Sequence, residues 1–154
     1  MTSIVSRATV LAIFTSACAT DSASPGSSSD AAVGGSQPLT LERDIQPILD
    51  TYCIDCHIEG AGDPHGHPHF TADSSRSAFA RMSDCTSAGT RVQLVTPGAP
   101  DTSFLLYKLG ASTTLSVAGT DCDDMMPLRA DAPLAELDPE AVTKIRAWIL
   151  DGAR

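Results

Sequence analysis

The residues of this chain best suited to chemistry lie in the stretch TYCIDCHIEG, residues 51–60, where Cys53, Cys56 and His57 fall within five positions. Two thiols and an imidazole at this spacing support three chemistries. They can attach a haem covalently, form half of a zinc site, or act as a redox-active dithiol. The rest of the chain has to decide among them.

Covalent haem attachment uses all three residues of the C-x-x-C-H pattern. Each thiol adds to one vinyl group of the haem, and residues three apart on a helical turn lie on nearly one face. Both sulfurs can therefore reach one edge of the porphyrin, while the histidine that follows can bind the iron. The pattern thus predicts one haem c, with Cys53 and Cys56 as thioether residues and His57 as an axial ligand.

The zinc alternative needs two further cysteine or histidine ligands. The stretch DPHGHPHF provides His65, His67 and His69, so this alternative stays open. However, no second well-spaced C-x-x-C pair is present, and histidines interleaved with Gly and Pro are typical of a solvated loop. A redox dithiol is expected in a βαβ setting, and the sequence shows no such alternation of strands and helices. Haem attachment is therefore favoured.

A haem bound by one histidine calls for a second axial ligand downstream, and the stretch DCDDMMPL, residues 121–128, offers two methionines. Pro127 disfavours helical backbone at the residue before it, which suits a thioether presented from a loop. Met126 is therefore the predicted ligand, with Met125 as the alternative. The competing interpretation is that both methionines fill the hydrophobic core.

Helices are expected to position these residues. Apolar residues at helical spacing predict a helix that leads into C-x-x-C-H and is interrupted at Pro47. Shorter helices are expected over residues 74–82 and within 100–110, and a last helix begins at the N-cap Asp138. Only the short run 91–97 has an extended character. The predicted fold class is therefore all-α, a small helical domain around one covalently bound haem.

The beginning of the chain has the proportions of an export signal over residues 1–18. An apolar run from Ala8 to Phe14 is too short to cross a bilayer as a helix, and small residues follow it. Residues 19–38 are rich in Ser, Gly, Ala and Pro and predict a flexible tether. Residues 39–154 are then the folded domain.

The end of the signal resembles that of bacterial lipoproteins, in which a small residue precedes the lipidated cysteine. Cys18 is the candidate for lipidation, although ACA at residues 17–19 can also be cut after Ala19. The location expected from this signal is the periplasm, or the outer membrane with the domain facing the periplasm or the cell surface. Any membrane association would come from the lipid anchor alone.

The net charge of −9 over 154 residues excludes one class of partner. Nucleic-acid phosphates require lysine and arginine, which this chain has in small number, so no nucleic-acid partner is expected. An acidic exported domain can instead meet basic surfaces of other proteins.

Two cysteines remain once Cys18, Cys53 and Cys56 are assigned. Export implies an oxidising compartment in which leftover cysteines pair, so a disulfide between Cys85 and Cys122 is predicted. The alternative is that these two are separate buried cysteines that act as small apolar residues.

Together these features resemble the class I-like cytochrome c domain across residues 39–154, and more narrowly the monohaem cytochrome domains of exported bacterial lipoproteins. The resemblance is carried by CIDCH, by VTPGAPDTSFLLYKL, and by MMP followed by the last helix. It implies that the first helix leads into C-x-x-C-H, that the methionine ligand precedes the last helix, and that the last helix crosses the first. The long interval from His57 to Met126 implies an insertion around residues 60–95.

The resemblance also implies a proline carbonyl that fixes the ring of His57 by accepting a hydrogen bond. Pro64 and Pro68 are both candidates. The function that follows from the resemblance is single-electron transfer to and from redox proteins, without an enzymatic activity of its own. The alternatives are a haem peroxidase or gas sensor with an open iron position, and a structural module that binds zinc.

Overall fold

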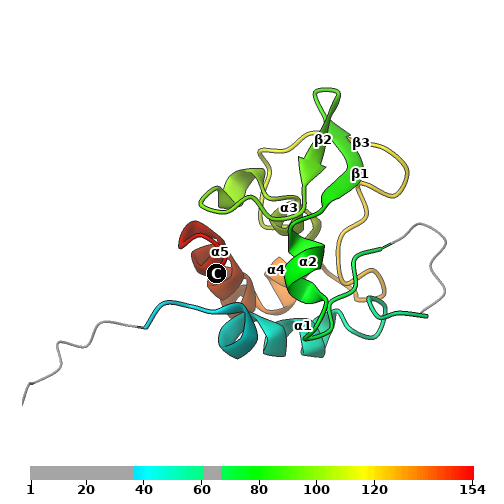
Figure 1. Cartoon of the computed structure of the whole chain (residues 1–154). Coiled ribbons are helices and arrows are strands. Elements are labelled where there is room, and N and C mark those ends of the chain that lie inside the picture. Colours follow the sequence, from blue (N-terminus) through cyan, green and yellow to red (C-terminus); the bar gives the residue numbers. More distant parts are fainter. Residues whose placement is uncertain (1–36, 61–66) are drawn as a thin grey trace, which may run out of the picture. The chain divides into compact units, whose positions relative to one another are not determined.

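The computed structural model describes residues 37–60 and 67–154 (Figure 1). All the described helices and strands belong to one compact unit, Ser36–Arg154. Several predicted features lie outside the described residues, namely the export signal, Cys18, almost all of the tether, Pro64 and His65.

Helical segments stand at both ends of this unit, and the sheet comes from the middle of the chain. The helical segments are η1 (Leu41–Ile45), α1 (Gln46–Tyr52), α2 (Ser75–Phe79), η2 (Pro100–Thr102), α3 (Phe104–Lys108), α4 (Leu134–Leu137) and α5 (Pro139–Leu150). The strands are β1 (Met82–Ser87), β2 (Thr90–Gln93) and β3 (Val117–Ala118). Figure 1 shows the sheet at the end of the unit away from α1, with α2 between them.

The all-α prediction is wrong, because the three strands form an antiparallel sheet in the order β2-β1-β3. Ser87 pairs with Thr90, so Ala88 and Gly89 alone connect β1 to β2. Both have positive φ, 50° and 77°, which is the geometry of a tight hairpin turn. The insertion expected around residues 60–95 therefore contains a hairpin, and the helix predicted over 74–82 ends early, at α2.

The interruption expected at Pro47 is confirmed. Proline has no backbone N–H, so the bond to the carbonyl of Arg43 that a regular helix requires cannot form. The chain instead makes the wider π-helical turn of η1, in which the Gln46 N–H donates to Leu41, and α1 begins directly afterwards. The Thr40 hydroxyl caps the start, accepting from the Arg43 N–H at 3.3 Å.

The last helix starts as predicted at Asp138, whose carboxylate accepts from the Ala141 N–H at 2.9 Å. Its apolar stripe is buried in the core, and Trp148 is 1 % exposed. η1 packs against α5, and the Leu41 N–H donates to the carbonyl of Arg154 at 3.0 Å. The first and last helical segments of the unit therefore contact each other, and α1 leaves this contact toward the C-x-x-C-H motif.

Replacing Gly110 by alanine is expected to destabilise the unit by about 2–3 kcal/mol. Gly110 has φ of 76°, and a Cβ there would lie 2.9 Å from Cβ of Pro133, directly before α4. Gly89→Ala is the matched control, because Gly89 has φ of 77° with no atom within 4 Å of the added carbon. Its expected loss is about 1 kcal/mol, from backbone strain alone. Equal losses in urea unfolding would contradict the close packing at Gly110.

Candidate functional site

The C-x-x-C-H motif forms one helical turn at the end of α1. The Cys53 N–H donates to Leu49 at 2.8 Å, which continues the helix. The carbonyl of Cys53 then accepts from the N–H groups of Cys56 and His57, at 3.2 and 3.0 Å. The three predicted haem residues therefore lie together on one turn, which is the local geometry that attachment of both sulfurs to one porphyrin edge requires.

Both cysteines of this turn are free thiols; Cys53 is half-buried and Cys56 is exposed. Burial, with a smaller contribution from the neighbouring Cys56, raises the pKa of Cys53 to about 11. Its thiol is therefore protonated at neutral pH. Redox-active C-x-x-C motifs depend on a thiol whose pKa is lowered, so the environment of Cys53 disfavours the dithiol alternative.

The ring of His57 is fixed by a proline carbonyl. Its Nδ1 lies 2.9 Å from the carbonyl oxygen of Pro68. Because a carbonyl can only accept, Nδ1 carries the proton, and Nε2 holds the lone pair that can bind a metal. Of the two candidate prolines, the structure thus selects Pro68.

A row of aromatic rings connects His57 to the hydrophobic core. The ring of Phe70 lies 5.1 Å from that of His57, and the Phe70 N–H donates to the His57 carbonyl at 2.8 Å. Phe70 stacks on Phe79 at 5.3 Å, and Phe79 contacts Trp148 at the same distance. The buried amide of Gln46 also donates to the carbonyl of Phe70 at 2.8 Å. The orientation of His57 is therefore anchored in the core.

The predicted second ligand lies in a segment held by its backbone on both sides. The Met126 N–H donates to the carbonyl of Lys108 at 2.6 Å, and the Met126 carbonyl accepts from the Leu134 N–H at 2.9 Å. Met126 is half-buried and packs against the hydrophobic core, as does Cys53. Met125 is 36 % exposed. The two methionines are thus in different environments, and core filling does not account for Met125.

The one-turn helix α4 connects the two candidate ligand segments. Its first residue, Leu134, holds Met126 by the bond just described. Asp138, directly after α4, accepts a hydrogen bond from the hydroxyl of Tyr52 at 2.9 Å. Tyr52 immediately precedes Cys53. A four-residue helix is about 6 Å long, so both segments are tied to the ends of one short rigid element.

Cys85 and Cys122 form a disulfide, with their Cα atoms 5.7 Å apart, and this is the pair that the cysteine count predicts. It joins β1 to the segment that follows β3, four residues before Met126. Figure 1 shows this segment running from the sheet toward α4. The disulfide therefore ties the start of the methionine loop, residues 121–126, to the sheet.

Replacing Cys85 and Cys122 together by serine is expected to lower the free energy of unfolding by about 3–4 kcal/mol. A crosslink between residues 37 apart removes that much chain entropy from the unfolded state. Urea unfolding gives the value, and reduction of the wild-type disulfide should reproduce it. A loss under about 1 kcal/mol would show that the crosslink does little for stability.

The histidine-rich stretch is only partly described. The ring of the half-buried His67 lies 5.4 Å from that of His57, and His69 is exposed. Within residues 37–60 and 67–154, no three or more His, Cys, Asp or Glu side chains are grouped closely enough to hold a metal ion. The zinc alternative thus gains no support from the described residues.

Exposed apolar side chains flank both predicted ligands. Ile58, directly after His57, is 42 % exposed, and Leu128, two residues after Met126, is 59 % exposed. Apolar side chains that face solvent at a candidate site suit contact with a large apolar ligand. Together with the thiol turn, the oriented imidazole and the methionine held by its backbone, they fit a covalently bound haem.

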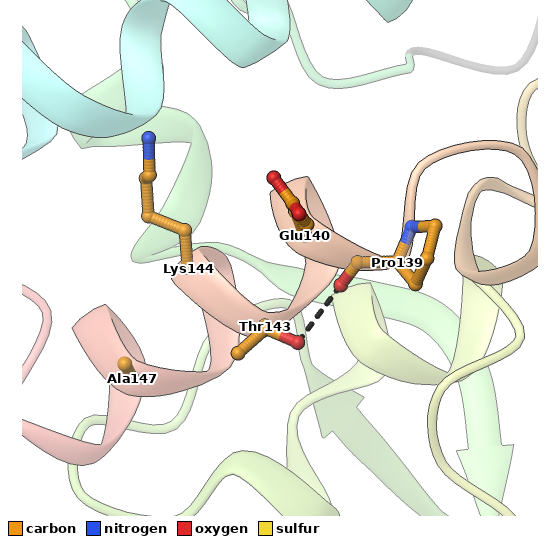
Figure 2. A pocket seen from close by; sticks show the side chains of 5 residues that line it. All are labelled: Pro139, Glu140, Thr143, Lys144 and Ala147. Carbon is orange, nitrogen blue, oxygen red and sulfur yellow. Dashed lines mark hydrogen bonds between the residues drawn. The ribbon is translucent and has the colours of Figure 1, made fainter.

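A separate hollow lies on α5 (Figure 2). Its five lining residues are Pro139, Glu140, Thr143, Lys144 and Ala147. None of them is a predicted haem residue, and all belong to one helix. The hollow is therefore distinct from the C-x-x-C-H turn and the methionine loop.

Comparisons with protein families, with curated proteins and with solved structures gave no match to this chain. Among the residues that the structure describes, the helices are all too short or too polar to cross a membrane.

Proposed function

We propose that this protein is an exported c-type cytochrome domain that transfers single electrons. One haem c is attached through Cys53 and Cys56, with His57 and Met126 as its axial ligands. The observation that carries the proposal is the C-x-x-C-H turn in which Nδ1 of His57 bonds to the carbonyl of Pro68. That bond fixes the tautomer in which Nε2 of the imidazole, the nitrogen that would bind iron, carries the lone pair.

Each residue of the proposed haem site has a separate role. Bound haem supplies an iron that exchanges one electron between the ferric and ferrous states. The sulfurs of Cys53 and Cys56 would hold the haem covalently, and the Pro68 carbonyl with the Phe70 ring holds the histidine in one orientation. Met126 would be the second iron ligand, presented from a segment whose backbone is held at Lys108 and Leu134. With two ligands from the protein, the haem would exchange an electron without binding a substrate.

The partners proposed are redox proteins with basic surfaces, because the chain carries a net charge of −9. A lipid on Cys18, with residues 19–38 as the tether, would hold the domain at a membrane surface of the periplasm or cell exterior.

Carbon monoxide separates electron transfer from a peroxidase or gas sensor with an open iron position. The spectrum of the reduced wild-type protein is expected to stay unchanged under carbon monoxide at neutral pH, because Met126 fills the sixth position. The variant Met126→Ala is the positive control and should bind the gas. Binding by the wild type as complete as by the variant would contradict the proposed ligand.

A further inference from the structure

Lys108, the last residue of α3, contacts the methionine loop at two places. Its backbone carbonyl accepts from the Met126 N–H at 2.6 Å. Its side-chain ammonium donates to the carbonyl of Asp121 at 2.9 Å. One residue thus bonds to positions 121 and 126, the two ends of the segment that carries the predicted iron ligand.

The environment of the ammonium differs from that of an ordinary surface lysine. Nζ lies 5.7 Å from the centre of the Phe104 ring, over its face, and the side chain is half-buried. Burial lowers the pKa of Lys108, while Asp124, Asp123 and Asp121 act in the opposite direction. The bond to Asp121 is itself exposed to solvent, so its strength comes from the charged donor rather than from burial.

The disulfide restrains the loop at the neighbouring residue. Cys122 follows Asp121 directly and is bonded to Cys85 of β1. The start of the loop is thus held by a covalent bond and by the Lys108 ammonium, and its end by the backbone bonds of Met126 to Lys108 and Leu134. Of these restraints, the Lys108 side chain is one that a substitution can remove without opening the disulfide.

We infer that Lys108 is a positioning residue, whose ammonium clamps the methionine loop at Asp121 and thereby keeps Met126 on the haem iron. This inference rests on the proposed function. Without the clamp the loop has more freedom, and the state in which the methionine has left the iron is more populated. An external ligand that competes for the iron then binds with a higher apparent affinity, in proportion to that population.

The test is a titration of the ferric, haem-loaded full chain with imidazole. Lys108→Met keeps the apolar stem and removes the donor, and it should bind imidazole about tenfold more tightly than the wild type. Lys108→Arg keeps a charged donor and should restore most of the wild-type resistance. Lys144→Met is the matched control, since Lys144 is the chain's other lysine and is exposed, and its imidazole affinity should equal that of the wild type.

The inference is overturned if Lys108→Met binds imidazole like the wild type, or if Lys108→Arg behaves like Lys108→Met. Met126→Ala is titrated in parallel. If the wild type already binds imidazole as tightly as this variant, the methionine ligand of the proposed function fails, and the role of Lys108 fails with it. If Lys108→Met does not fold, Lys108→Gln, which is too short to reach Asp121 but stays polar, takes its place with the same expected increase.

Discussion

The double variant Cys53→Ala/Cys56→Ala, made in cells that attach haem c, is expected to retain no haem through acid–acetone extraction. Each thioether bond needs one of these two sulfurs, and the structure places both on the single turn that ends α1. Removal of both therefore removes covalent attachment altogether, which is a complete loss and the largest effect expected of any substitution in this chain.

Cys85→Ser/Cys122→Ser is the matched control for that experiment. It also removes two cysteines, but they are bonded to each other in the structure. Its haem should survive extraction as the wild-type haem does. Haem that stays with the Cys53→Ala/Cys56→Ala protein through extraction would show that these two cysteines do not attach it. Haem lost from the control by extraction would show that covalent attachment depends on Cys85 and Cys122.

The variant Met126→His is expected to lower the midpoint potential by roughly 0.1–0.3 V, within the range of about 0.8 V over which axial ligands set haem potentials. A thioether stabilises the ferrous state, and an imidazole in its place removes that preference. The loop is held by its backbone at Lys108 and Leu134, so the new side chain starts from the same position. A redox titration with optical detection measures the shift.

Met125→His is the control, because Met125 precedes Met126 but is 36 % exposed and is the alternative ligand. Its midpoint potential should stay near that of the wild type. A shift confined to Met125→His would exchange the roles of the two methionines. No shift in either variant would mean that the iron has no methionine ligand.

The features that sequence alone predicted are those governed by neighbouring residues. Pro47 interrupts the first helix because its own nitrogen lacks a hydrogen, and Asp138 starts the last helix because its own carboxylate caps the nearby Ala141 N–H. The C-x-x-C-H turn is likewise closed by bonds within five residues. These effects act over less than two helical turns, so the amino-acid order is sufficient to show them.

The features that were missed depend on segments far apart in the chain. The hairpin of β1 and β2 has the turn Ser-Ala-Gly-Thr, which lacks the Asn-Gly or Asp-Gly signal, and Cys85 is the one fully buried residue of β1. Strand β3 pairs with β1 from about thirty residues away. Local residue propensities therefore favour an all-α fold, whereas pairing between distant segments produces a sheet.

Parts of the candidate site also depend on contacts between segments far apart in the chain. Sequence offered two prolines for the His57 ring, and only the packing of the loop over residues 67–70 distinguishes Pro68. The two bonds of Lys108 to the methionine loop had no signal in the sequence, because a lysine at the end of a helix is ordinarily solvated. An aromatic residue directly after a polar, histidine-rich stretch was an available signal for Phe70, whose ring contacts His57.

The most direct test of the central claim is the absorption spectrum of the reduced protein, produced with a haem c maturation system and followed by a pyridine haemochrome assay. We predict a sharp α-band in the reduced protein and haem that resists acid–acetone extraction. In the oxidised protein we predict a weak band at about 695 nm from the methionine ligand. A colourless protein would contradict the cytochrome proposal and direct attention to metal analysis of the cysteine and histidine residues. Haem that is fully extracted would contradict covalent attachment at Cys53 and Cys56.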